Sequence, residues 1–331
     1  MGVGFRVLTK GTSQLVSCIQ NMLDERGIPG AVLVLVKDGE ILYTHEFGDF
    51  DIDSIFPVAS ATKLVSATLM LSLVSDGKLG LDESVAEYLP FFTKRKARIT
   101  IRHLLACTSG LPSRVAWQSS SSISLEESVA RIAKLRLEAE PGEAFIYGGV
   151  GFQVAGRVAE VASGKPWHQL FHEKIAAPLG MMNTGYGQLD WKGRYLDTSQ
   201  RPNPRIGGAL WTTPRDYAGV LNLLLNRGVF EGHRLIDENL VQQMFKSQIE
   251  NAIVKRTVSA NPAAKYSLGA WIEAVTPLGD ATLISSPGVF GFFPWINLDL
   301  GYGGLIAMNY HYRKLGNWYP TMIEMADQLV V

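Results

Sequence analysis

The octapeptide Phe56-Pro57-Val58-Ala59-Ser60-Ala61-Thr62-Lys63 is the most informative stretch of this sequence. Its first half is extended in character. A helical pattern begins at Ser60, continues to about Leu73 and stops at Asp76-Gly77. Residues three apart lie on one face of a helix, so the octapeptide predicts that the Lys63 amine lies beside the Ser60 hydroxyl.

These two side chains have the residue types of a nucleophile and its base. A serine hydroxyl is a poor nucleophile alone, and a lysine can accept its proton only when burial or a nearby positive charge lowers the lysine pKa. The apolar neighbours of the pair predict that burial, and a helix N-terminus favours negative charge developing at Ser60. The spacing alone is weak evidence, because Ser75 and Lys78 repeat it at a helix end. Considered without its context, a serine at the start of a helix, such as Ser60, is more often an N-cap with a solvated lysine nearby.

Signals outside the octapeptide place β-structure at both ends of the chain. A capped amphipathic helix is predicted from Thr12-Ser13 to a stop near Gly27, and a hairpin is predicted to turn at Asp38-Gly39. The predicted strands are 31–36, 41–45, 266–273, 281–285, 292–298 and 303–308, and a helix over 319–331 closes the chain. This order predicts an α+β fold, an α/β sandwich in which helices flank a central antiparallel β-sheet.

The middle of the chain is mostly helical in character. Helices are predicted at 100–105, 125–135 and 151–162, and a further helix starts at Thr213 with Pro214 just inside its cap. The Ser-rich stretch from Arg114 to Ser124 predicts a surface loop. We therefore expect a sheet domain made of residues 1–66 and 205–331, a mainly helical domain inserted at 67–204, and an active site between them.

Ordered landmarks across nearly the whole chain resemble the serine β-lactamase and penicillin-binding-protein superfamily. The resemblance is closest to its class C-like branch, which includes the family VIII carboxylesterases, and it implies the β-lactamase/transpeptidase-like fold. It is carried by the octapeptide and by IRHLLACTSGLP (101–112), PGEAFIY (141–147), GGALWTTPRD (207–216) and SPGVFG (286–291).

The resemblance implies a role for each catalytic group. Ser60 is expected to be the acylated nucleophile, and Lys63 is expected to accept its proton, alone or together with Tyr147. Tyr147 is expected to carry that proton to the leaving group, with Lys63 as the cation that lowers the phenol pKa from about 10. The backbone N–H groups of Ser60 and Val289 are expected to form the oxyanion hole. Without these motifs, Tyr147 would more often be a half-buried structural residue.

Two motifs depart from the pattern of the superfamily. The second motif is usually Tyr-x-Asn, but here it is Tyr147-Gly148-Gly149, without the amide that commonly holds the substrate's acyl amide. The third motif usually carries Lys, or in esterases often His or Trp, but here it is Ser286-Pro287-Gly288. No ammonium is therefore available there to bind the carboxylate of a β-lactam or a peptide, and Pro287 predicts an edge or irregular strand. Both departures favour a neutral ester as substrate.

Candidate substrate contacts lie in or beside these motifs. The aromatic candidates, together with Phe292, are predicted to line an apolar acyl or alcohol pocket, although ordinary core positions explain them equally well. The candidates are Gly149, Ser286, Gly288, Phe290, Trp211 and Trp117.

Composition argues against several other classes of protein. Lys+Arg and Asp+Glu number 31 each, and a net charge of zero gives no reason to expect nucleic acid or an anionic membrane as partner. No stretch is long and apolar enough to span a bilayer, and residues 1–14 lack the pattern of a signal peptide, so a cytoplasmic protein is expected. Cys18 and Cys107 make no disulfide framework. His168 and His172 lack further ligands, so neither a metal nor another cofactor is predicted.

The leading hypothesis is a serine hydrolase that cleaves small carboxylic esters through an acyl-Ser60 intermediate. The same site also suits a β-lactamase, a D-amino-acid peptidase or amidase, or an acyltransferase. The altered second and third motifs leave open a catalytically weak binding protein of the same fold, since a fold does not fix a function. The expected partner is a small-molecule ester, lactam or amide, and the sequence leaves both a monomer and a homodimer open.

Overall fold

The computed structural model describes residues 11–189, 195–196, 202–259, 261, 263–316 and 318–330. The helices are α1 (Thr12–Arg26), α2 (Thr62–Ser75), α3 (Val85–Tyr88), α4 (Ile101–Leu105), α5 (Leu125–Ile132), α6 (Val150–Ser163), α7 (Trp167–Phe171), α8 (Pro214–Leu225), α9 (Glu238–Gln243) and α10 (Trp318–Val330). The strands are β1 (Gly30–Lys37), β2 (Glu40–Gly48), β3 (Phe56–Pro57), β4 (Ala144–Ile146), β5 (Gly185–Tyr186), β6 (Gln188–Leu189), β7 (Tyr195–Leu196), β8 (Leu210–Thr212), β9 (Val229–Phe230), β10 (His233–Arg234), β11 (Ile253–Arg256), β12 (Lys265–Tyr266), β13 (Trp271–Val275), β14 (Ala281–Ser285), β15 (Phe292–Asn297) and β16 (Tyr302–Met308).

A seven-stranded antiparallel sheet joins the two ends of the chain. Its strand order is β12-β13-β14-β15-β16-β1-β2, so the first hairpin joins the sheet through the antiparallel pairing of β1 with the last strand, β16. The hairpin turns at Asp38 and Gly39, which both have positive φ, as the tight turns of twisted hairpins require. The predicted α+β fold with a central antiparallel sheet is confirmed.

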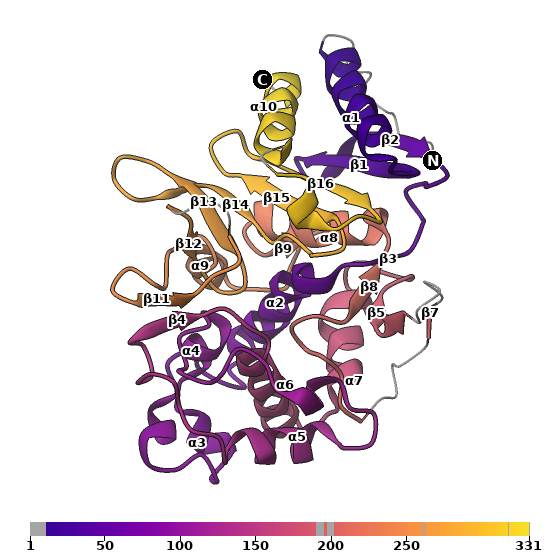
Figure 1. Cartoon of the computed structure of the whole chain (residues 1–331). Helices are drawn as coiled ribbons and strands as arrows, with labels where there is room; N and C mark the ends of the chain where they lie inside the picture. The colour runs from indigo at the N-terminus through magenta and orange to yellow at the C-terminus, as the bar shows by residue number, and fades with distance from the viewer. Residues whose placement is uncertain are drawn as a thin grey trace.

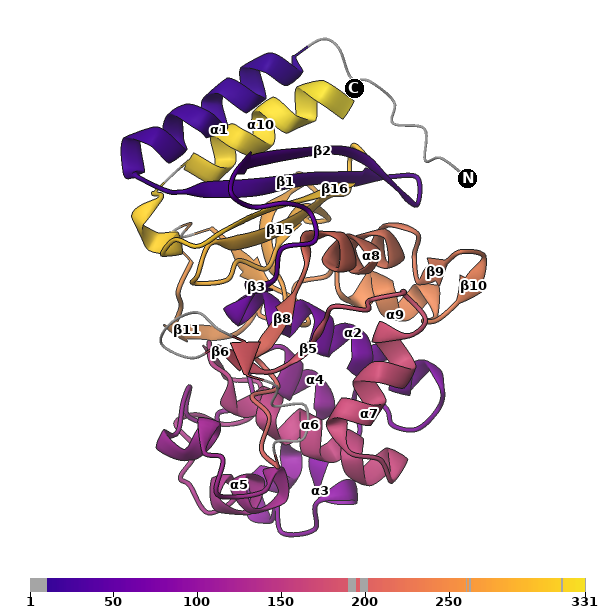
Figure 2. The same cartoon turned by 90° about the vertical axis from the view of Figure 1, so that its right-hand side faces the viewer.

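Strand β1 is buried on both faces, because helices cover the sheet on each side. Ala31, Leu33 and Leu35 face one hydrophobic cluster, which includes residues of α1 and α10. The alternating residues Val32, Val34 and Val36 face a second cluster, which includes residues of α8 and α2. Figure 2 shows α1 and α10 side by side over one face of the sheet and α8 on the other. An unbroken run of apolar residues is what such a doubly covered strand requires.

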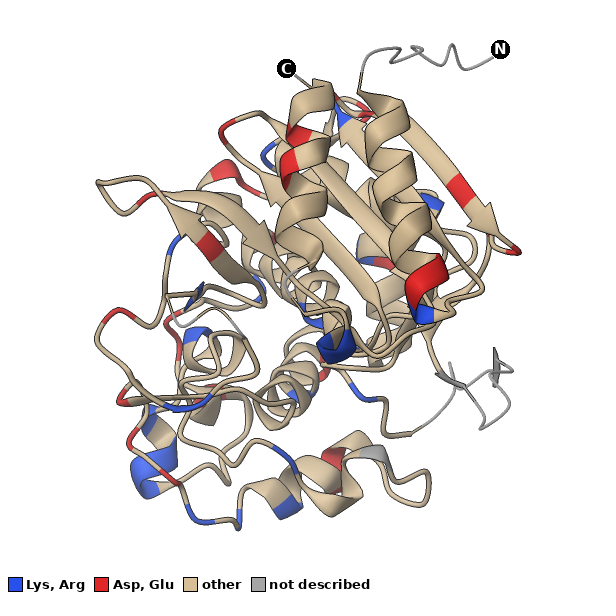
Figure 3. Ribbon diagram, turned by 45° about the horizontal axis from the view of Figure 1, so that its top comes forward, with Lys and Arg blue, Asp and Glu red and all other residues tan. Residues whose placement is uncertain are grey.

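Helices α2–α7 form a second body below the sheet (Figure 1). We call α2–α7 the helical lobe, and the seven-stranded sheet with α1, α8 and α10 the sheet lobe. Residues 62–73 of α2 are all buried, so this helix is a central element of the molecule rather than a surface helix. In the view of Figure 3, acidic and basic residues are interspersed on both lobes. The predicted division of the chain at residues 66 and 204 remains a prediction.

Three details differ from the sequence predictions. The run predicted as one strand over 266–273 is two strands, because Gly269 has a φ of 85° and the Ser267 N–H bonds to the Ala270 carbonyl at 2.8 Å, which makes a tight turn. The N-cap of α1 is Gly11, so no Thr or Ser side chain occupies the predicted cap position. Ser60 lies in a short 3₁₀ turn, η1 (Ala59–Ala61), which leads directly into α2.

The predicted start of the helix at Thr213 agrees with the structure. Thr213 caps α8 by accepting a hydrogen bond from the Asp216 N–H at 3.1 Å, with Pro214 in the first turn. At the start of α4, His103 completes a capping box with Thr100. None of the helices in the described residues combines the length and the apolarity needed to cross a bilayer.

Candidate active site

The turn that carries Ser60 is held between the two lobes. Strand β3 pairs with β8, which places Pro57 opposite Trp211, and the chain then tightens into η1. Ala59 has a φ of 43°, a left-handed conformation that a residue with a Cβ adopts at a cost of order 1–3 kcal/mol. Strained backbone of this kind concentrates at functional sites. Ser60 is half-buried and lines a pocket at this junction.

Lys63 reaches the Ser60 hydroxyl from the first turn of α2. Its Nζ lies 3.4 Å from Ser60 Oγ and 2.8 Å from the Gly207 carbonyl oxygen, and the residue is only 3% exposed. Burial lowers the pKa of Lys63 from its usual value to about 8; Cys107 acts to raise it and the nearby Arg205 to lower it. The predicted pairing of an amine with a serine hydroxyl is present, and the amine is buried as expected.

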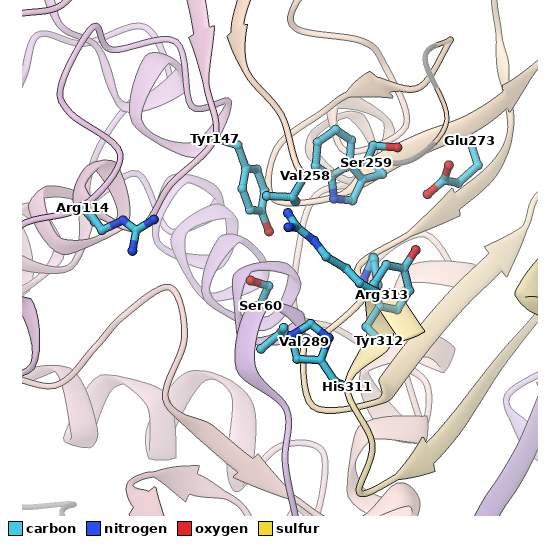
Figure 4. A pocket seen from close by; sticks show the side chains of 12 residues that line it. Ser60, Arg114, Tyr147, Val258, Ser259, Glu273, Val289, His311, Tyr312 and Arg313 are labelled. Carbon is cyan, nitrogen blue, oxygen red and sulfur yellow. The ribbon is translucent and has the colours of Figure 1, made fainter. Parts of the chain in front are cut away.

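Tyr147, the third predicted catalytic residue, lies next to Ser60 and Lys63. Its ring lies 4.8 Å from Lys63 Nζ, and Figure 4 shows its hydroxyl pointing toward Ser60. Trp271 and Tyr266 pack on the ring, with centroids 5.1 and 5.7 Å away. Burial raises the pKa of Tyr147 above its ordinary value, although the hydrogen bonds with Ser60 and Trp271 oppose this. The expectation that Lys63 lowers the phenol pKa is therefore wrong: desolvation outweighs the interactions that favour the phenolate.

The GGALWTTPRD landmark has a direct structural role beside the Ser60–Lys63 pair. The Gly207 carbonyl holds the lysine, and the Thr62 hydroxyl accepts a hydrogen bond from the Leu210 N–H at 3.1 Å. The Leu210 carbonyl in turn accepts from the Val58 N–H at 3.0 Å. Residues 207–212 therefore fix the turn from both sides of Ser60.

The altered second motif fits a loop packed closely against it. A Cβ on Gly148 would overlap the Ser113 carbonyl oxygen, and a Cβ on Gly149 would overlap the amide of Gln118. The Gly149 N–H bonds to the same Ser113 carbonyl at 3.0 Å. Gln118 is 6% exposed, so the stretch predicted as a surface loop is partly buried. The Gln118 amide thus lies next to Gly149, the position at which the second motif usually carries an asparagine.

The altered third motif forms an irregular loop between β14 and β15. Pro287 lies outside both strands, as predicted, and the buried Ser286 hydroxyl donates to the Gly269 carbonyl at 3.3 Å. Gly288 passes so close to the chain before Ser60 that a Cβ would overlap the Val58 carbonyl oxygen. Within the described residues, the Val289 N–H donates to no backbone carbonyl, and Figure 4 shows Val289 beside Ser60.

A cavity of about 450 Å³ opens over these groups (Figure 4). This volume lies in the usual range for small-molecule sites. Its lining adds residues that the sequence did not single out as site residues, because they come from segments far apart in the chain. The lining residues are Ser60, Arg114, Tyr147, Val258, Ser259, Trp271, Glu273, Pro287, Val289, His311, Tyr312 and Arg313.

The six predicted substrate contacts do not line this cavity. Trp117 is half-buried and its indole N–H donates to the Ser128 carbonyl at 3.3 Å, while Trp211 packs over Gly185 in the small sheet of β3, β8 and β5. Phe290 is half exposed at the loop tip. The other three are Gly149, Ser286 and Gly288, which pack against the protein as described above. Their contact with a substrate remains a prediction.

Comparison with known proteins identifies the family of the chain. The family model described as Beta-lactamase matches residues 15–318. A solved structure of a putative beta-lactamase from Bacteroides dorei is 33% identical, with a TM-score of 0.84 over 96% of this chain and 98% of that one. EstCE1, described as a hydrolase with promiscuous acyltransferase activity, shares the fold at 22% identity, with a TM-score of 0.78 over 98% and 99% of the two chains.

Two curated relatives add to this picture. Protein flp of Staphylococcus aureus is 26% identical over 98% of this chain and 68% of its own length. Esterase EstB of Burkholderia gladioli is 32% identical over a shorter match, which covers 53% of this chain and 51% of the esterase.

Proposed function

The chain belongs to the beta-lactamase family and is a serine hydrolase at this coarse level; from that premise we propose that it hydrolyses carboxylic esters through an acyl intermediate on Ser60. The observation that carries the proposal is the buried Lys63 amine, 3.4 Å from the Ser60 hydroxyl and with a pKa lowered to about 8. At pH 7 roughly a tenth of such an amine is neutral and able to accept a proton, far more than of an ordinary lysine.

Acylation starts when the Ser60 Oγ attacks the ester carbonyl carbon. A bond forms between Oγ and that carbon while the hydroxyl proton moves to Lys63 Nζ. The carbonyl oxygen becomes negatively charged, and the N–H groups of Ser60 and Val289 stabilise it. The carbon–oxygen bond to the alcohol then breaks. The leaving oxygen takes a proton from the Tyr147 hydroxyl, which is replenished from Lys63.

Deacylation uses the same groups in the opposite sense. A water molecule takes the place of the alcohol and gives a proton to the Tyr147–Lys63 pair as its oxygen attacks the acyl carbon. The bond to Ser60 Oγ then breaks, the carboxylic acid leaves, and Oγ regains its proton. Because burial keeps Tyr147 protonated at rest, Lys63 is the resting base and Tyr147 the relay.

The substrate assignment to esters rests on two further points. The third motif offers no ammonium at Ser286-Pro287-Gly288, where the superfamily usually places a lysine. The relative EstB carries the name esterase. The alternative of a non-catalytic binding protein is disfavoured, because a lysine buried without a catalytic use is a costly feature to retain.

Release of p-nitrophenol from short-chain p-nitrophenyl esters tests this proposal. Ser60→Ala should abolish turnover, and Lys63→Ala should lower it by several orders of magnitude. The second Ser-x-x-Lys spacing supplies matched controls: Ser75 lies at the far end of α2, so Ser75→Ala and Lys78→Ala should keep wild-type turnover. Near-native turnover in Lys63→Ala would overturn the mechanism. Turnover of nitrocefin but not of the esters would move the substrate to β-lactams.

A further inference from the structure

The carbonyl that holds Lys63 lies on a segment without regular secondary structure. Residues 203–209 belong to neither a helix nor a strand, although Ile206 and Gly207 are buried. The Gly207 carbonyl accepts a hydrogen bond from Lys63 Nζ at 2.8 Å. A helix or a sheet holds its carbonyls through its own backbone hydrogen bonds, whereas a buried irregular segment needs other partners. The partners of this segment therefore decide where the acceptor for Lys63 lies.

Two fully buried side chains bind the backbone of Ile206. Its N–H donates to Gln153 Oε1 at 3.0 Å, and its carbonyl accepts from the Ser66 hydroxyl at 2.5 Å. The Ser66 hydroxyl also bonds with the Tyr186 hydroxyl at 2.6 Å. The two side chains come from α2 and α6, which pack against each other. Both polar groups of the residue before Gly207 are thus fixed by side chains of the helical lobe.

A second buried amide fixes the orientation of Gln153. The Gln153 Nε2 donates to Asn203 Oδ1 and to the Pro204 carbonyl, both at 2.8 Å. The Asn203 Nδ2 donates in turn to two backbone carbonyls of the 114–124 loop, at 3.1 and 3.3 Å. Each amide oxygen faces a donor and each amide nitrogen faces acceptors, so a flip of either amide would break these bonds. The Gln153 oxygen is therefore held toward Ile206.

The Gly207 carbonyl decides which way the Lys63 amine points. A neutral amine has two N–H donors and one lone pair, and the lone pair must face Ser60 to accept its proton. Donation of one N–H to the carbonyl leaves the lone pair free to face Ser60 Oγ, 3.4 Å away. The same carbonyl also stabilises the ammonium form, and a hydrogen bond to the charged form of a lysine raises its pKa.

We propose that Gln153 and Ser66 are positioning residues for the catalytic lysine. They hold Ile206, and through it the Gly207 carbonyl, which orients the amine of Lys63. Neither side chain lines the cavity, so each acts on the reaction through the lysine rather than through the substrate. The proposal rests on the ester hydrolysis proposed above and adds two residues to it.

Ser66→Ala tests this role with the smallest change. We would measure kcat/KM for a p-nitrophenyl ester from pH 6 to 9.5. The value on the high-pH plateau should fall by about tenfold or more, because the amine is no longer held in its productive direction. The midpoint of the rise should move to lower pH by about one pH unit, because the Lys63 ammonium loses an acceptor while its burial remains.

Ser72→Ala is the matched control. Ser72 is also buried in α2, but its hydroxyl donates to the Leu69 carbonyl of the same helix at 2.8 Å. This variant should keep both the plateau and the midpoint. An unchanged midpoint in Ser66→Ala would overturn the inference even if the plateau falls, because a merely structural role lowers the rate without changing the pKa of Lys63. Equal changes in both variants would overturn it as well.

The other charged and titratable groups that face Lys63 include Cys107, Arg205 and Tyr147. Arg205 lies on the same segment as Gly207, and its charge acts to lower the pKa of Lys63. Movement of Arg205 away from the lysine would therefore raise that pKa, which is opposite to the expected shift. The comparison is repeated in an Arg205→Gln background, where the shift to lower pH should persist.

Gln153→Met tests the second side chain. Methionine has a similar length but makes none of the three hydrogen bonds, so the midpoint should move in the same direction as in Ser66→Ala. Asn297→Leu is its control, because this buried amide joins β15 to α10 through Asp327 at 2.8 Å. Asn297→Leu should lose thermal stability and keep the wild-type midpoint. If Gln153→Met does not fold, Ser66→Ala still decides the inference.

Titration of the lysine itself separates this inference from the proposed function. If wild type hydrolyses no ester, the proposed function fails, and NMR of protein with ¹³C-labelled lysine still measures the pKa of Lys63. The Lys63 signal is assigned by its absence from Lys63→Ala. A pKa about one unit lower in Ser66→Ala than in wild type and Ser72→Ala would support the inference. Equal values in wild type and Ser66→Ala would refute it.

Discussion

At the scale of single residues, burial shifts the pKa values of Lys63 and Tyr147 in opposite directions. Burial penalises the ammonium of Lys63 and lowers its pKa to about 8, whereas it penalises the phenolate of Tyr147 and raises that pKa. One group is thereby made a better base and the other is kept as an acid. This opposite effect on two adjacent groups is the arrangement that general acid–base catalysis needs.

The pH dependence of turnover follows from this difference. Lys63 must be neutral to accept the Ser60 proton, so kcat/KM should rise about tenfold per pH unit below 8 and level off above about pH 8. Burial keeps Tyr147 protonated across this range, so no loss of rate should appear between pH 8 and 9.5. Initial rates with a p-nitrophenyl ester, corrected for spontaneous hydrolysis, provide the measurement. A rate that is flat or falls from pH 6 to 8 would show that Lys63 is not the base.

The proximity of Ser60 and Lys63 was easier to predict from the sequence than the side chains that surround them. Ser60 and Lys63 share a helical face by spacing alone, so their proximity could be anticipated. The pKa of Tyr147 could not, because it depends on Tyr266 and Trp271, which pack on its ring from a distant part of the chain. Arg313 had no local signal at all, since nothing in its neighbours indicates which cavity its side chain enters.

At the scale of elements, the loop between β14 and β15, which carries the third motif, packs against the turn that carries Ser60. Gly288 lies against the Val58 carbonyl, and its N–H bonds to the Phe292 carbonyl at 2.7 Å. The next residue, Val289, supplies the proposed second oxyanion donor. The position of that donor therefore depends on a contact that only a glycine allows.

Gly288→Ala should separate the loop from the turn. The added methyl group would overlap the Val58 carbonyl oxygen, so the loop must shift and carry Val289 away from Ser60. Losing one oxyanion donor costs about 10²–10³-fold in kcat, and we expect a fall of that order in ester turnover. Steady-state kinetics, read at a temperature where a thermal melt shows the variant folded, measures it.

Gly279→Ala controls for the general cost of an added methyl group. Gly279 lies in the turn between β13 and β14, has a φ of 91° and has open space around its Cβ position. This variant should lose some thermal stability through backbone strain yet keep its turnover. Equal loss of turnover in both variants would contradict the role assigned to the Gly288 contact.

Prediction at this scale succeeded where one segment determines its own structure. The Asp38-Gly39 hairpin and the Thr213-Pro214 helix start both depend on local backbone preferences. The 266–273 run failed because its apolar pattern looks continuous, whereas Gly269 turns the chain beside the Lys63 carbonyl. A Cβ at Gly269 would lie too close to that carbonyl, and periodicity does not report such a tertiary contact.

At the scale of the whole molecule, the site exists because the chain ends and the chain middle meet. The sheet lobe combines strands of residues 30–48 and 265–308, and the helical lobe supplies Tyr147 and Arg114. Ser60 lies in η1, directly before the buried helix α2, and Figure 1 shows α2 where these bodies join. The ordered landmarks of the sequence were enough to anticipate this architecture, whereas the lining of the cavity needed the assembled fold.

The central claim is that Ser60 becomes covalently acylated, and trapping that bond tests it most directly. We would treat wild type and Ser60→Ala with a phosphonate ester that forms a stable adduct, then determine intact mass and map the modified peptide. The account predicts one adduct per chain, located on Ser60 in wild type and absent from Ser60→Ala. An adduct on Cys107 or Tyr147, or ester turnover that survives in Ser60→Ala, would contradict it.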